Sequence, residues 1–166
     1  MKDTYIQRVP TWFLRGVIFI IGIIALLLCI FSLPKLGHGI AIEYPEIASL
    51  RYPVLVGMYA AAIPFFIMLS KALMLLSYID KNKAFSESST KALRQIKYGG
   101  FTMSLLLYAS LMPLFFRVAQ IEDAPGIVII GAIVTSIPIV VAVFSAILER
   151  LLRSAIDLQA ENNLTV

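Results

Sequence analysis

Four long apolar runs, separated by short polar segments, make up most of this chain. They cover about residues 12–33, 53–77, 99–116 and 126–148. At about 1.5 Å of rise per residue, each run is about long enough to cross a hydrocarbon core of about 30 Å as an α-helix. None shows the strict alternation of apolar and polar residues that a membrane β-strand requires. The pattern predicts an all-α polytopic membrane protein, with residues 1–166 forming a single domain that is a bundle of four transmembrane helices.

The polar segments between the runs predict the remaining elements. Residues 78–98 form a link and residues 149–166 a tail, both on one side of the membrane. Within the link, Ser86 is expected to cap a helix that begins at Glu87, because its hydroxyl can accept a hydrogen bond from a free backbone N–H group. That helix should run into the third span through Gly99 and Gly100. The loop 34–52 on the other side is either a polar connector with a short helical turn or a sensing loop for a ligand or peptide.

The distribution of basic residues predicts the orientation, because Lys and Arg near membrane ends are retained in the cytoplasm. Of the fourteen Lys and Arg, only Lys35, Arg51 and Arg117 flank the spans on the side of the loop 34–52. The others lie at the opposite side: Lys2, Arg8, Arg15, Lys71, Lys81, Lys83, Lys91, Arg94, Lys97, Arg150 and Arg153. Both termini are therefore expected in the cytoplasm, with the protein in the plasma membrane. The first span is expected to be a retained anchor, since no small-residue cleavage site follows it.

Composition agrees with a membrane protein and offers little chemistry. Sixty per cent of the residues are hydrophobic, and the net charge of +4 comes from basic residues at span ends, so direct binding of nucleic acid is not expected. The single cysteine, Cys29, excludes an intramolecular disulfide. His38 is the single histidine, and there is no CxxC, HExxH or phosphate-binding glycine loop. We expect no catalytic, cofactor or metal site, and no enzymatic activity.

Ionisable residues inside the spans are costly to bury and are therefore the first candidates for a functional role. Lys71 and Glu149 both lie toward the cytoplasmic ends of their spans, and we predict an ion pair between them. Pro64, Pro113 and Pro138 lie inside spans two, three and four, where each removes a backbone donor and is expected to mark a kink.

Small residues four positions apart allow two helices to approach closely. Gly57 with Ala61, and Ala142 with Ala146, have this spacing. The spacing is equally compatible with packing inside one bundle and with contact between protomers of a homo-oligomer.

Two stretches resemble a known family. They are Leu76-Ser77-Tyr78-Ile79-Asp80-Lys81-Asn82-Lys83-Ala84-Phe85-Ser86 and the ending that runs from Glu149-Arg150-Leu151-Leu152 to Glu161-Asn162-Asn163-Leu164-Thr165-Val166. Both are similar to a family of small bacterial four-span membrane proteins that carries a domain of unknown function. Asn163 stands where that family usually has an acidic residue. The resemblance implies a gene neighbour that encodes a helix-turn-helix regulator of the Xre/Cro type, and no catalytic or ligand residues.

Two functions follow as hypotheses. The first is a membrane sensor or anchoring partner of a cytoplasmic transcriptional regulator, which would dock on the link and the tail. The residues expected at that surface are Asp80, Lys81, Asn82, Phe85, Ser86, Glu161, Asn162 and Leu164. The second is a small permease, or an immunity protein that protects the cell against membrane-active compounds. In that case the kinked helices and the loop 34–52 would matter most.

Overall fold

The computed structural model describes the backbone of residues 3–164 and the side chains of residues 11–163. The elements of this part are α1 (Asp3–Leu27), the π-helical turn η1 (Leu28–Ser32), α2 (Leu33–Glu43), the 3-10 helix η2 (Pro45–Leu50), α3 (Arg51–Asp80), α4 (Glu87–Ile121) and α5 (Gly126–Leu164). No strand occurs among them. The predicted all-α fold class is confirmed.

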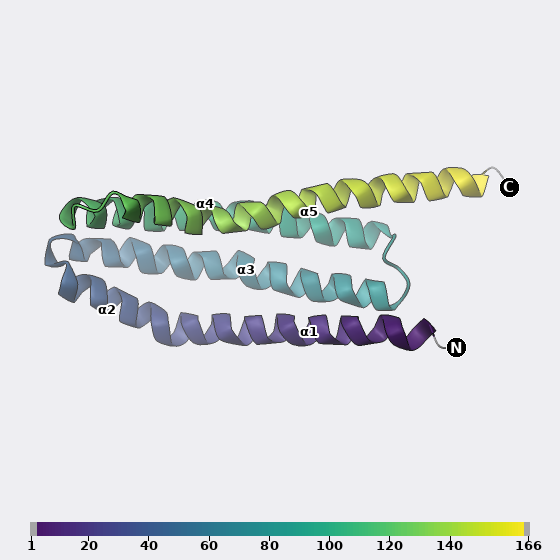
Figure 1. The fold of residues 1–166 in the computed structure, drawn as a ribbon, viewed down its shortest axis with the longest axis horizontal. Helices are drawn as coiled ribbons and strands as arrows, with labels where there is room; N and C mark the ends of the chain where they lie inside the picture. Colours follow the sequence, from purple (N-terminus) through teal and green to yellow (C-terminus); the bar gives the residue numbers. More distant parts are fainter. Residues whose placement is uncertain (1–2, 165–166) are drawn as a thin grey trace.

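The long helices lie side by side and antiparallel, as Figure 1 shows. The extensive contacts join α3 to α4 and α4 to α5, while α1 and α2 pack against α3. The lateral order of the helices is therefore their order in the sequence. The start of α1, the link 81–86 and the end of α5 lie at one end of the molecule, and α2, η2 and the turn between α4 and α5 lie at the other (Figure 1).

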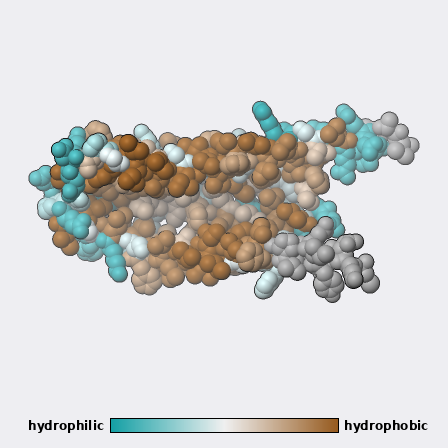
Figure 2. All heavy atoms as spheres, in the orientation of Figure 1, coloured by the Kyte–Doolittle hydropathy of each residue, from teal (hydrophilic) through white to brown (hydrophobic). Residues whose placement is uncertain are grey.

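Four helical segments are long and apolar enough to span a membrane: Thr11–Glu43, Pro45–Asp80, Glu87–Ile121 and Gly126–Asn163. Apolar side chains cover the middle of the visible face, and hydrophilic ones gather at both ends (Figure 2). Phe19 and Ile133 are each 61% exposed. Exposure of such apolar side chains is unfavourable in water and favourable in lipid. The outward-facing side chains match a hydrocarbon environment.

The helices pack through small residues. A Cβ atom built on Gly100 of α4 would lie 2.6 Å from the Pro138 carbonyl oxygen and 2.9 Å from the Ala142 Cβ, both on α5. Gly99 faces α3 instead, and a Cβ atom built on Gly99 would lie 2.6 Å from the Met68 Cγ of that helix. Consecutive glycines therefore allow α4 to approach both of its neighbours, and α4 continues through them without a break.

The small-residue pairs predicted from the sequence pack within the chain. Gly57 lies directly against Ser110 of α4, and Ala61 is 1% exposed. Ala142 is fully buried beneath Gly100. Three of the four residues therefore serve intramolecular contacts, and the homo-oligomer stays a prediction.

The region 34–52 is helical, which corrects the expectation of a loop. The first span continues through η1 into α2 and ends at Glu43, and η2 follows after Tyr44. Pro34, at the start of α2, has no N–H to donate into the preceding turn. The Leu33 N–H donates to the Leu28 carbonyl, and the Tyr59 hydroxyl donates to the Cys29 carbonyl at 3.0 Å. The π-helical turn and Tyr59 together satisfy the backbone around a proline that would otherwise end the helix.

Candidate docking and polar site at the basic end

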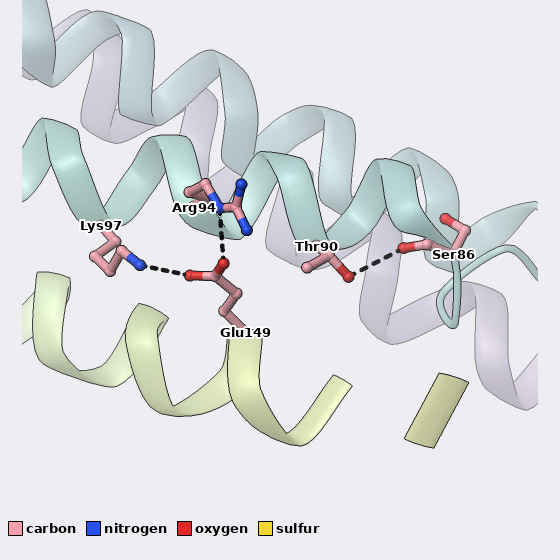
Figure 3. A network of polar contacts seen from close by, with 5 residues as sticks. All are labelled: Ser86, Thr90, Arg94, Lys97 and Glu149. Carbon is pink, nitrogen blue, oxygen red and sulfur yellow. Dashed lines mark hydrogen bonds and ion pairs between the residues drawn. The ribbon is translucent and has the colours of Figure 1, made fainter. Parts of the chain in front are cut away.

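The polar features gather at the end of the molecule that holds the link 81–86, the first turns of α4 and the part of α5 from Glu149 onward, which we call the basic end. Glu149 is 8% exposed and projects from α5 toward α4. Its carboxylate accepts hydrogen bonds from the Arg94 Nε at 2.9 Å and the Lys97 Nζ at 2.7 Å (Figure 3). Arg94 and Lys97 are three residues apart and so share one face of α4. Two cations compensate one buried carboxylate and tie the two helices together.

The predicted Lys71–Glu149 pair is wrong. The Lys71 Nζ lies 3.8 Å from the Met74 Sδ on its own helix, and Glu149 bonds to Arg94 and Lys97. The physical reason is the order of the helices, since Lys71 is on α3 and α4 packs between α3 and α5. The spacing of Arg94 and Lys97 indicates that they share one helical face, but it does not indicate which helix that face meets.

A second ion pair ties the first span to the end of α3. The Arg15 guanidinium lies 2.7 Å from the Asp80 carboxylate, and both side chains are partly exposed. Asp80 was expected to face a partner protein. In the structure it instead holds α1 against the end of α3, a contact that nothing in the sequence indicated.

The link itself is tightly folded. Asn82 adopts a positive φ of 56°, and the Lys83 N–H donates to the Tyr78 carbonyl at 2.8 Å, which closes α3 with a left-handed cap. The Ser86 hydroxyl accepts a hydrogen bond from the Ser89 N–H at 3.3 Å, so the predicted N-cap is confirmed. The Thr90 hydroxyl in turn donates to the Ser86 carbonyl (Figure 3).

The predicted docking residues of the link therefore divide into two kinds. Ser86 and Asp80 are engaged in a cap and an ion pair. Lys81, Asn82 and Phe85 are exposed, and Phe85 is 63% exposed, so it does not pack onto the first turn of α4 as a buried staple. Among the predicted docking residues from Asp80 to Ser86, these three are exposed and serve neither the cap nor the ion pair.

The tail continues α5 as a helix well beyond Glu149. The 39 residues of α5 span about 58 Å, which exceeds the hydrocarbon core of about 30 Å. Arg153 and Ile156 line a common hollow with Glu87 and Thr90 of α4, so they are level with the first turn of α4. The remaining residues of α5 project past the link (Figure 1).

The part of α5 beyond Glu149 carries an exposed apolar stripe. Leu151 is 62% exposed and Leu158 is 65% exposed, and their separation of seven positions places both on one helical face. At 100° per residue, this face is nearly opposite to the one that carries Glu149 and packs on α4. Glu161 and Asn162 are also exposed, whereas the side chain of Leu164 and residues 165–166 lie outside the described part.

The opposite end holds a second hollow. It measures about 480 Å³ and lies between α2 and α4, with Lys35 and Glu43 on its polar rim. Beside it, the Tyr44 hydroxyl donates to the Glu122 carboxylate at 3.1 Å. That hydrogen bond raises the pKa of the Tyr44 phenol, because the phenol must keep its proton to donate. Among the side chains of residues 11–163, no three His, Cys, Asp or Glu groups lie together as a metal ion would require.

These features define the class of protein: a polytopic α-helical membrane protein with four apolar helices and a polar, basic end. Residues 35–166 match the family model described as Protein of unknown function (DUF2975), and the chain belongs to this family. It is also 48% identical over 160 residues to the "Uncharacterized membrane protein YoaS" of Bacillus subtilis (strain 168). That similarity covers 96% of this chain and 99% of the relative. No solved structure matches the chain.

Proposed function

We propose that this protein is a membrane anchor or sensor for a cytoplasmic transcriptional regulator, without enzymatic activity of its own. It lies in the plasma membrane with the basic end and both termini in the cytoplasm. The excess of Lys and Arg at that end supports this orientation.

The exposed stripe of Leu151 and Leu158 is the observation that carries the proposal. Two leucines, more than 60% exposed, lie on a helix that extends past the other helices at the basic end. An apolar face with leucines seven positions apart, on a helix that projects, fits the groove of a partner helix or domain. Leu158 lies in the part of α5 beyond the first turn of α4, where water rather than lipid surrounds the helix.

The nature of the partner follows from the family resemblance, which implies a helix-turn-helix regulator of the Xre/Cro type. The basic end is a poor binding site for DNA itself. Arg15, Arg94 and Lys97 are all paired with carboxylates, and the other cations lie where membrane headgroups compete for them. A separate DNA-binding protein would therefore supply the contact with the genome.

Leu158→Glu tests the docking role. A partner that covers the stripe would bury the new carboxylate, which is strongly unfavourable, so much less regulator should be recovered when the full-length variant is purified from its own membranes in mild detergent. Gln159→Glu is the matched control, because it adds the same charge at the neighbouring exposed position and should retain the partner. Mass spectrometry of the purified material identifies and quantifies the partner.

Recovery of the wild-type protein without a regulator would overturn the proposal. The hollow with Lys35 and Glu43 would then favour the second candidate, a permease or an immunity protein. In that case, deletion of the gene should change the sensitivity of cells to membrane-active compounds. Expression of the Leu158→Glu variant in the deletion strain should restore resistance as well as expression of the wild type does.

A further inference from the structure

A groove between α4 and α5 at the basic end has the polarity of a phospholipid. It measures about 420 Å³ and opens to the surface on the flank of the two helices. Its polar half is lined by Lys97, Glu149, Arg150 and Arg153. Its apolar half is lined by Phe101, Val143, Ala146 and Ile147.

The charges of the polar half favour an anion. Three cations face one carboxylate, and that carboxylate already accepts hydrogen bonds from Lys97 and from Arg94 outside the groove. Lys97 is held further by the ring of Tyr98, whose centroid is 5.0 Å from the Lys97 Nζ. Arg150 and Arg153 are exposed, and no acidic side chain among residues 11–163 forms an ion pair with either of them. Two guanidinium groups are therefore available for a phosphate, which they bind in bidentate geometry.

The order of polarity along the groove distinguishes a lipid from a free anion. Val143 and Ile147 lie toward the middle of the membrane, and Arg153 lies about 15 Å from Val143 along the helix axis. Phe101 is 46% exposed and Ile147 is 50% exposed, so the apolar half presents side chains to an acyl chain. A phospholipid has its phosphate at the interface and its acyl chains below, in the same order as the groove.

We propose that this groove is a binding site for an anionic phospholipid, with the headgroup phosphate held by Arg150 and Arg153 beside Lys97, and an acyl chain lying along Phe101, Val143 and Ile147. Basic pockets between transmembrane helices on the cytoplasmic side are suited to such headgroups. The site does not include Leu151 or Leu158, so the lipid proposal and the docking proposal can be tested independently.

Native mass spectrometry of the full-length protein in mild detergent, titrated with dioleoyl-phosphatidylglycerol, tests the site. The double variant Arg150→Gln/Arg153→Gln should weaken binding about 10- to 30-fold, since each basic residue near an anionic headgroup contributes about one factor of five. Lys81→Gln/Lys83→Gln is the matched control: it removes the same charge at the same end, outside the groove, and should bind as the wild type does. The unfolding midpoint of each variant without added lipid verifies that the fold is intact, which is expected because all four side chains are exposed.

Two further arms separate the alternatives. Dioleoyl-phosphatidylcholine should bind at least about tenfold more weakly than the anionic lipid, and millimolar inorganic phosphate should not displace the lipid. Ile147→Gln should weaken the binding of the anionic lipid and leave any binding of inorganic phosphate unchanged. Equal losses in the two double variants, or equal binding of the zwitterionic lipid, would overturn the proposal. Displacement by inorganic phosphate would likewise show a site for a free anion only.

Discussion

At the residue scale, Glu149 organises the basic end. It is the carboxylate that the structure buries at the α4–α5 interface, and Arg94 and Lys97 contact it from the facing helix. A buried carboxylate with two hydrogen-bonded cations is tolerated, whereas removal of one partner leaves an uncompensated charge. The sequence identified Glu149 as a residue of interest and assigned it the wrong cation.

A double-mutant cycle checks this assignment. Glu149→Gln and Lys97→Gln should each lower the midpoint of thermal unfolding in detergent, because each leaves a charged group without its partner. The midpoint of the double variant should fall by clearly less than the sum of the decreases in the two single variants, since the residues interact directly. Lys71→Gln is the control, and its effect should add to that of Glu149→Gln without coupling. Coupling between positions 71 and 149 would contradict the observed geometry.

At the element scale, α4 is the central helix. It packs against α3 through Gly57 and Gly99 and against α5 through Gly100, and the Ser104 hydroxyl donates to the Thr135 carbonyl on α5 at 2.6 Å. Membrane helices lack a hydrophobic driving force for association, so close approach and interhelical hydrogen bonds must supply it. The smallest residues therefore occupy the positions where two backbones meet.

Gly100→Leu tests this packing. The new side chain must displace the Pro138 carbonyl and Ala142, and overpacking of this kind costs about 1–3 kcal/mol, seen as a lower unfolding midpoint in detergent. Gly16→Leu on α1 is the matched control, because no atom lies within 4 Å of a Cβ at that position. It should leave the midpoint unchanged or raise it slightly, since leucine has the higher helix propensity. Equal destabilisation by both variants would refute close packing at Gly100.

At the scale of the whole molecule, the two ends differ in charge and in architecture. One end holds Glu149 and its partners, the projecting helix and the groove between α4 and α5; the other holds α2, η2 and the hollow with Lys35. Because basic residues are retained in the cytoplasm, we propose that the first end lies at the inner face. The proposed partner and the proposed lipid site both require this orientation.

Cysteine labelling tests the orientation. In a Cys29→Ala background, Ser88→Cys at the basic end should react with a membrane-impermeant maleimide only after the cells are permeabilised. Glu46→Cys at the opposite end should react in intact cells. Both positions are exposed, so access to reagent depends on the side of the membrane. The reverse pattern would place the basic end outside the cell and remove the basis for a cytoplasmic regulator.

The sequence alone determined the class, the spans and the local signals. Four apolar runs require helices because lipid leaves no other partner for the backbone, and Ser86 was recognisable as a cap because capping depends on adjacent residues only.

Tertiary structure decided what local patterns do not encode. The lateral order of the helices determined that Glu149 meets Lys97 rather than Lys71, that Gly99 and Gly100 face different neighbours, and that Arg150 and Arg153 line a groove with Phe101. Each of these contacts joins residues about 30 to about 50 positions apart, and its formation depends on which helix faces which, a property of the packed molecule as a whole.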